Sequence, residues 1–210
     1  MKTPRSAADL ERIRERIIEA ALTILDEEGF PSLTMRRLAT RLHMSAPNLY
    51  NFFKSKEEIY ISIVIKGFQM LFDELDTARK SCPDPLSRGR SLVEAYIRFG
   101  LENKAYYDIM FTRATPKYND YVGTPYENLS EVEYKISMDI AKLGVEALND
   151  VVKGASQLSQ EDLVHSIVKI WSLLHGMISL ANSNIIGYVA SDVDTTYNRI
   201  IDELVEQYSA

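Results

Sequence analysis

Apolar side chains recur every three or four residues along most of this 210-residue chain, the interval that places them on one face of an α-helix. No segment shows the alternation that a half-buried β-strand requires. With 46% hydrophobic residues, the chain can fill a sizeable core. The sequence therefore predicts an all-α protein, and its first helical stripe contains Leu10, Ile13, Ile17, Ala20, Ala21, Ile24 and Leu25 before Gly29 stops it.

Start and stop signals divide the remainder into further helices. Ser55–Glu58 has the composition of a capping box and predicts a long helix that ends before Pro83. Ser130–Glu133 has the same composition and predicts a helix that ends near Gly154. Helical stripes are also expected at residues 86–99, 106–111, 163–181 and 197–205, whereas the prolines, glycines and asparagines of residues 112–129 predict a flexible flap that borders a pocket.

Basic residues are concentrated near the N-terminus. Residues 34–56 contain five basic side chains and no acidic one, in a chain whose formal charge is −6. Residues 1–56 carry ten Lys or Arg and seven Asp or Glu, a net charge of +3, so residues 57–210 carry −9. Affinity for DNA comes largely from neutralising phosphates. The sequence therefore predicts a DNA-binding domain at residues 1–56 and a larger helical domain with other partners at residues 57–210.

The basic window has the spacing of two short helices joined by a turn. Thr34 is suited to cap a helix that buries Leu38, and Ser45 is suited to cap a second helix that buries Leu49. Between them, His43 occupies a position that requires a left-handed backbone, which glycine adopts freely and histidine adopts at some cost. This arrangement is typical of a helix-turn-helix, whose second helix enters the major groove of DNA.

These residues resemble the TetR-type bacterial transcriptional regulators. The resemblance spans roughly residues 10–60 and rests on Leu33-Thr34, Leu38-Ala39, Ser45, Leu49-Tyr50, Phe53 and Lys56-Glu57-Glu58. The chain departs from the family pattern at His43, where glycine is usual, and at Phe52, where histidine or tyrosine is usual. The resemblance implies a three-helix DNA-binding domain followed by a helical domain for ligand binding and dimerisation.

The resemblance also implies which residues contact DNA: Thr34, Arg36, Ser45, Ala46, Pro47, Asn48, Tyr50, Asn51 and Lys56. Thr34, Tyr50 and Lys56 are expected at phosphates, and Arg36 at a base, because a guanidinium suits the guanine edge. The residues that follow Ser45 are expected to read the major groove, where an asparagine suits adenine. Simpler roles stay open, since Thr34 and Ser45 can serve only as caps and Tyr50 can be a core aromatic.

The last two predicted helices carry broad apolar stripes. One contains Leu163, Ile167, Ile170, Leu174, Ile178 and Ala181, and the other contains Tyr197, Ile200, Ile201, Leu204 and Val205. A helix-turn-helix protein reads a pseudo-palindrome as a dimer, so we expect these two helices to form a homodimer interface. The alternative is that both stripes belong to the core of a monomer.

The segment Trp171-Ser-Leu-Leu-His175-Gly176 resembles the Trp-His-Gly signature of one C-terminal domain type among TetR-like proteins. It places Trp171 and His175 one helical turn apart. An apolar pocket with few polar groups suits a small-molecule effector, and the candidate lining is Phe99, Tyr107, Met110, Phe111, Tyr134, Met138, Trp171 and His175. Each of these residues can instead be part of the core, and His175 can be satisfied by backbone or water.

Several classes of protein are not expected. The sequence has no HExxH motif, no phosphate-binding glycine loop and no nucleophile elbow, so we predict neither an enzyme nor a resident cofactor or metal. The single cysteine, Cys82, has no partner for an internal disulfide, which is typical of the cytoplasm. No uninterrupted apolar run approaches the length of a membrane span, and the N-terminus does not have the pattern of a signal peptide.

The sequence thus predicts a one-component regulator that binds double-stranded operator DNA as a dimer. By the resemblance it is a bacterial repressor, released when an apolar or amphipathic small molecule binds the helical domain. The alternative is a protein-interaction module that kept the helix-turn-helix shape and lost DNA binding.

Overall fold

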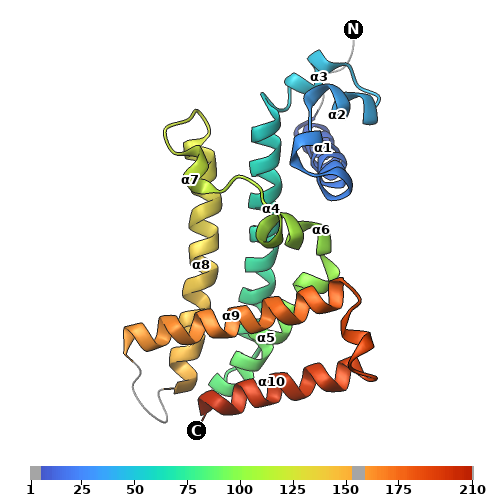
Figure 1. The fold of residues 1–210 in the computed structure, drawn as a ribbon. Coiled ribbons are helices and arrows are strands. Elements are labelled where there is room, and N and C mark those ends of the chain that lie inside the picture. Colours follow the sequence, from blue (N-terminus) through green and yellow to red (C-terminus); the bar gives the residue numbers. More distant parts are fainter. Residues whose placement is uncertain (1–5, 153–158, 210) are drawn as a thin grey trace. The chain divides into compact units, whose positions relative to one another are not determined.

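The computed structural model describes residues 6–152 and 159–209, and these residues form helices and no strand, as the sequence predicts (Figure 1). The chain divides into two compact units. The first comprises the residues up to Phe68 together with Ala105–Lys135, and the second comprises Gln69–Lys104 and Ile136–Ala210. The long helices α4 (Lys56–Ser81) and α8 (Glu127–Val152) each contribute residues to both units.

The first unit contains the predicted helix-turn-helix. Its elements, besides parts of α4 and α8, are α1 (Ala7–Glu28), the 3₁₀ turn η1 (Phe30–Ser32), α2 (Met35–Arg41), α3 (Ala46–Tyr50), α6 (Lys104–Tyr107), the π-helical turn η2 (Asp108–Thr112) and α7 (Tyr118–Tyr121). Helices as short as α2 and α3 are not stable alone. They fold here because Leu38, Leu49 and Phe53 are almost completely buried. Arg14 of α1 also donates a hydrogen bond to the Phe52 carbonyl (2.6 Å), which fixes the chain just after α3.

The second unit is built around α5 (Pro85–Glu102), with α9 (Gln160–Asn182), the 3₁₀ turn η3 (Ile186–Tyr188) and α10 (Val193–Ser209). Both α9 and α10 pack against α5 (Figure 1). The approach of α9 is close at Gly100, where an added Cβ would lie 2.7 Å from Ile178 Cδ1. Tyr197 of α10 donates a hydrogen bond to the Met177 carbonyl (2.5 Å). A further apolar cluster joins α8 to α9 through Leu148, Val152 and Leu163.

Two predictions about local structure are wrong. The helix α8 begins at Glu127, before Ser130, and the buried Ser130 hydroxyl donates to the Glu127 carbonyl (3.0 Å). The serine is therefore not a cap, because its hydroxyl bonds to the preceding turn of the same helix. Residues 112–129, predicted as a flap of turns without a regular element, contain the helix α7 and the buried Tyr121, and the pocket that they were expected to border stays a prediction. The predicted helix end at Gly154 lies outside the described residues.

We predict that Gly100→Ala lowers the free energy of unfolding by about 1–3 kcal/mol, because its Cβ would overlap the Ile178 side chain. The matched control is Gly144→Ala inside α8, where a Cβ would meet Ile167 Cδ1 at an ordinary 3.6 Å. Removing this helical glycine should leave the protein unchanged or stabilise it by about 0.5–1 kcal/mol. Urea unfolding of both variants checks the prediction, and equal effects at the two positions would contradict it.

Candidate nucleic-acid interface

Both predicted caps of the helix-turn-helix are present. The Arg37 backbone N–H donates to Thr34 Oγ1 (3.2 Å), and the Asn48 N–H donates to Ser45 Oγ (3.4 Å). His43 adopts the left-handed conformation that its position in the turn requires, with φ of 53°. The hydroxyl protons of Thr34 and Ser45 stay available when their oxygens accept these bonds, so capping and a phosphate contact are compatible.

The side chains around α3 separate into a buried and an exposed set. Leu49, Phe52 and Phe53 are buried, so Phe52 cannot offer a phosphate the polar group that histidine or tyrosine would supply at this position. Tyr50 is 51% exposed, which excludes the interpretation that it is a core aromatic. The nine residues predicted to contact DNA lie at the start of α2, on α3 and its two caps, or at the start of α4. Each of them is exposed or half-buried.

The basic side chains of this surface differ in whether contacts within the protein already occupy them, which decides how readily they can bind phosphates. Arg37 forms an ion pair with Glu28, and Arg41 forms one with Glu27 (3.2 Å). The Lys56 ammonium lies 4.6 Å from the centroid of the Phe30 ring. Within the described residues, Arg36 is exposed and has no ion pair. Arg36 is therefore the basic residue of α2 most available to DNA.

In the second unit, the Trp171 and His175 side chains meet at a buried tyrosine that the sequence analysis did not assign to the site. The Trp171 indole N–H donates to Tyr96 Oη (2.6 Å), and Tyr96 Oη lies 3.1 Å from His175 Nε2. The Tyr96 hydroxyl therefore links the Trp171 and His175 side chains, and the tautomer of the imidazole sets which of Tyr96 Oη and His175 Nε2 is the donor. Burial raises the pKa of Tyr96 and lowers the pKa of His175, so both groups stay neutral.

The other predicted effector residues are distributed over the two units. In the second unit, Phe99 is fully buried on α5, the helix that also carries Tyr96. In the first unit, Tyr107 and Met110 are buried, and the Tyr107 ring lies 5.1 Å from that of Phe111. Two of the predicted residues on α8 are exposed: Met138 in the second unit, and Tyr134 in the first, whose ring stacks on Tyr118 at 4.8 Å. Their assignment to one effector site stays a prediction.

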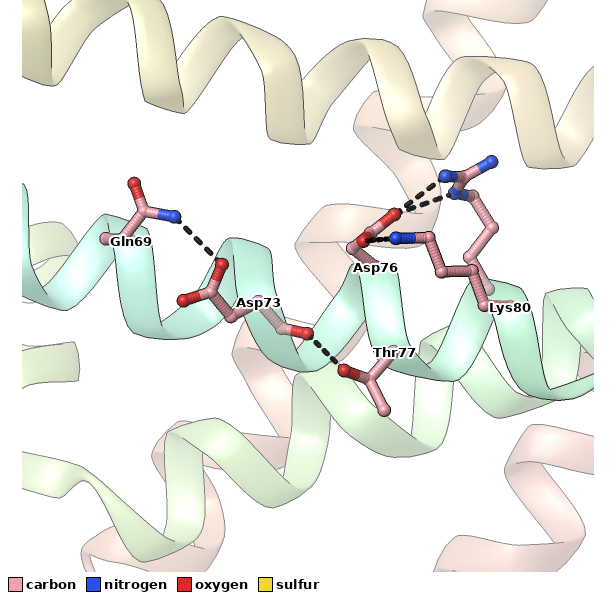
Figure 2. Close-up of polar contacts among 6 residues, drawn as sticks. Gln69, Asp73, Asp76, Thr77 and Lys80 are labelled. Carbon is pink, nitrogen blue, oxygen red and sulfur yellow. Dashed lines mark hydrogen bonds and ion pairs between the residues drawn. The ribbon is translucent and has the colours of Figure 1, made fainter.

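A groove of about 440 Å³ between α4 and α5 has a different character from the predicted apolar site. It is lined by Asp73, Glu74, Thr77, Ala78, Ser81, Ser91, Glu94 and Arg98. Figure 2 shows how one edge is ordered: the Gln69 amide donates to the Asp73 carboxylate (2.8 Å), and Thr77 donates to the Asp73 carbonyl (2.8 Å). The nearby Asp76 pairs with Lys80 and Arg79. In the part of the chain that the structure describes, no three His, Cys, Asp or Glu side chains gather as a metal site would require.

The helix α9 presents an unusual amount of apolar surface. It is the one described helix long and apolar enough to cross a membrane, although length and composition are weak evidence for such a role. Its buried residues include Ile178, which packs against α5, and Leu163, which packs against α8, whereas Val164, Val168, Trp171, Leu173 and Leu180 are exposed. The apolar stripe of α10 is less open, because Tyr197, Ile201 and Leu204 are buried within the unit.

Two family models match the sequence. The model described as "Bacterial regulatory proteins, tetR family" matches residues 17–63, and the model described as "Tetracyclin repressor-like, C-terminal domain" matches residues 90–204. The chain belongs to the TetR family. It is therefore a transcriptional regulator and not an enzyme, as the sequence predicts. The finer resemblance to the Trp-His-Gly type stays a prediction.

Relatives and solved structures agree with this membership in the TetR family. The chain is similar to "Uncharacterized HTH-type transcriptional regulator YobS" of Bacillus subtilis, 26% identical over 80% of this chain and 78% of the relative. It is also similar to Rv0681 of Mycobacterium tuberculosis, an uncharacterized HTH-type regulator 28% identical over 87% of this chain and 74% of the relative. A solved structure, described as a protein with unknown function from Rhodococcus sp. RHA1, covers 100% of both chains with a TM-score of 0.76 and 18% identity, which shows the shared fold alone.

The chain is also similar, over a shorter length, to two regulators of Mycolicibacterium smegmatis, one named as a repressor and the other as an activator. The transcriptional repressor KstR is 31% identical over 42% of this chain and 43% of its own length. The transcriptional activator FasR is 29% identical over 53% of this chain and 48% of its own length.

The hydrogen bond at His175 leads to a pH prediction. Burial lowers the pKa of His175, so the folded state favours the neutral ring. In the unfolded chain, histidine has a pKa of about 6.5. The resulting stability is present above that pH and is lost as the pH falls below it. Urea unfolding at roughly pH 7.5 and 5.5 should show a larger loss for the native protein than for His175→Gln. An unchanged loss in His175→Gln would contradict the prediction.

Proposed function

We propose that this TetR-family regulator binds a pseudo-palindromic operator as a homodimer, and that each copy inserts α3 into the major groove. The observation that carries the proposal is the two-sided character of the helix-turn-helix. Leu49 and Phe53 are buried in the core, whereas Tyr50 and Arg36 are exposed, and Arg36 has no ion pair to another described residue. An exposed guanidinium suits a base edge, and an exposed phenol hydroxyl suits a phosphate.

The proposed dimer forms mainly through α9. The exposed apolar residues lie on two edges of its open face, and small residues, Ser172, Gly176 and Ser179, lie between them. A Cβ added at Gly176 would meet no atom of its own chain within 4 Å, so packing inside one copy does not explain this glycine. A second helix could approach closely along this strip while the apolar edges are buried. A two-fold dimer uses the same surface twice, which suits the two half-sites of an operator.

The proposed effector is an apolar or amphipathic small molecule that binds the helical domain at residues 57–210 and releases the operator. The aromatic residues around Tyr96, Trp171 and His175 supply an apolar surface with a few neutral polar groups, which suits such a ligand. Release requires only that the effector bind the DNA-incompetent state more tightly, and a hundredfold preference corresponds to about 2.7 kcal/mol.

We propose that the bound protein represses transcription. The name of KstR supports a repressor and the name of FasR supports an activator, and repression is the sign that the family resemblance implies. A DNA-binding regulator of this kind acts in the bacterial cytoplasm, where its operator lies. The alternative function is an interaction module that no longer reads DNA, and the exposed Arg36 and Tyr50 favour DNA binding over it.

The DNA-binding proposal is tested by selection from a random duplex library at fixed salt. The native protein should recover an inverted repeat, and the double variant Arg36→Ala, Tyr50→Ala should recover none. The control is Arg199→Ala, which removes one positive charge from an exposed position on α10. We expect the control to select the same repeat as the native protein. Recovery of the same repeat by the double variant would remove these two residues from the interface.

The dimer proposal predicts that Val168→Asp converts the protein to a monomer, because a charge would be buried in the interface. Val168 is 53% exposed in one copy, so its own fold should tolerate the change. The matched control is Val122→Asp in the first unit, at a valine 52% exposed. Sedimentation velocity should detect a monomer for the first variant and a dimer for the control, and a dimer in both would contradict an α9 interface.

A further inference from the structure

Arg113 forms an unusual link between two segments of the first unit that are far apart in the sequence. Its guanidinium donates to the Leu25 carbonyl (2.9 Å) and the Asp26 carbonyl (2.6 Å), and it pairs with the Asp26 carboxylate (3.0 Å). These carbonyls belong to the last turn of α1, which has no basic residue of its own. A cation at the C-terminal end of a helix stabilises that end. A residue that follows η2 thus completes the first helix of the DNA-binding segment.

The turn that Arg113 holds is also the platform for α2. Glu27 and Glu28 of the same turn pair with Arg41 and Arg37, at opposite ends of α2. From Glu28 the chain passes through η1 and reaches the cap of α2 at Thr34. The position of Arg36 therefore depends on the last turn of α1 through both covalent connection and ion pairs.

The segment that carries Arg113 is in turn fixed to α4. Tyr60 donates to the Pro116 carbonyl (3.0 Å), and a Cβ at Gly67 would come within 2.5 Å of Met110 Sδ, so η2 lies directly against the α4 backbone. Lys117 turns back and donates to the Met110 carbonyl (3.0 Å). Residues 108–117 therefore bridge α4 and the last turn of α1.

The bridge includes an uncommon helical conformation. The Arg113 N–H donates to the Asp108 carbonyl five residues earlier (2.8 Å), which is the bond of a π-turn. A π-turn is rare and is often found at functional sites. Conversion to an ordinary α-turn would shift the register of the residues that follow and withdraw the guanidinium from α1.

We propose that Arg113 is a positioning residue for operator binding, and that residues 108–117 regulate the DNA-binding surface by holding or releasing the last turn of α1. This inference rests on the proposed operator binding. When Arg113 is in place, α1 and α2 present Arg36 in a fixed position. When it is withdrawn, that turn must be ordered on binding DNA, and operator affinity falls.

Arg88 provides a matched control in the second unit. Its guanidinium donates to the Cys82 carbonyl (3.1 Å) and the Pro83 carbonyl (2.6 Å) and pairs with Asp150 (3.2 Å), so it makes the same kinds of contact just after α4. Arg88→Ala and Arg113→Ala should cost similar stability. They should differ in operator affinity only if Arg113 has the proposed role.

The experiment compares the native protein, Arg113→Ala, Arg113→Lys and Arg88→Ala on the selected operator, at a temperature where circular dichroism shows each one folded. We expect Arg113→Ala to weaken operator binding by about fivefold or more and Arg88→Ala to leave it within about twofold. Arg113→Lys keeps the charge but cannot make all three contacts, so it should lie between native protein and Arg113→Ala. The Gly29 amide, which donates to Leu25 O, should exchange its hydrogen faster in Arg113→Ala only.

Equal or stronger operator binding by Arg113→Ala overturns the inference, and so does an equal loss in Arg88→Ala. Faster exchange at Gly29 with unchanged affinity also overturns it, because Arg113 would then only stabilise the fold. If Arg113→Ala does not fold, Arg113→Lys decides, and native affinity in that variant counts against the inference. Failure of the native protein to select any operator refutes the proposed function itself and is distinct from these outcomes.

Discussion

The burial of three apolar side chains beneath two very short helices is the interaction on which the DNA-binding surface depends. The helices α2 and α3 have seven and five residues, far below the length at which a helix is stable alone. Leu38, Leu49 and Phe53 are nearly inaccessible to solvent and hold both helices in the first unit. Because Leu49 and Phe53 point into the core, Tyr50, which lies between them in the sequence, points to solvent.

The same packing also fixes several of the basic side chains of the helix-turn-helix. Several basic residues of this segment are partly committed within the protein, since Arg37 and Arg41 pair with the end of α1 and Lys56 lies over Phe30. These contacts orient α2 and reduce the number of cations free for phosphates. The count of five basic side chains in residues 34–56 therefore overstates the number of cations available to DNA, and Arg36 gains importance because it has no ion pair to another described residue.

The features that were predictable from the sequence are local. The caps at Thr34 and Ser45 and the left-handed His43 involve residues within three positions of each other, so the pattern alone predicts them. The cap at Ser130 was predicted wrongly because a buried serine can bond to its own helix instead. Tyr96 and Arg113 were missed because their partners lie 75 to 88 residues away in the sequence, and an isolated tyrosine or arginine carries no local signal of such a contact.

The central claim is that two copies present α3 to successive major grooves of one operator. Hydroxyl-radical footprinting of the selected operator tests this claim most directly. Two protected patches related by a two-fold axis, with centres about one helical turn or 34–36 Å apart, are predicted. A single patch, or protection without symmetry, would contradict the claim.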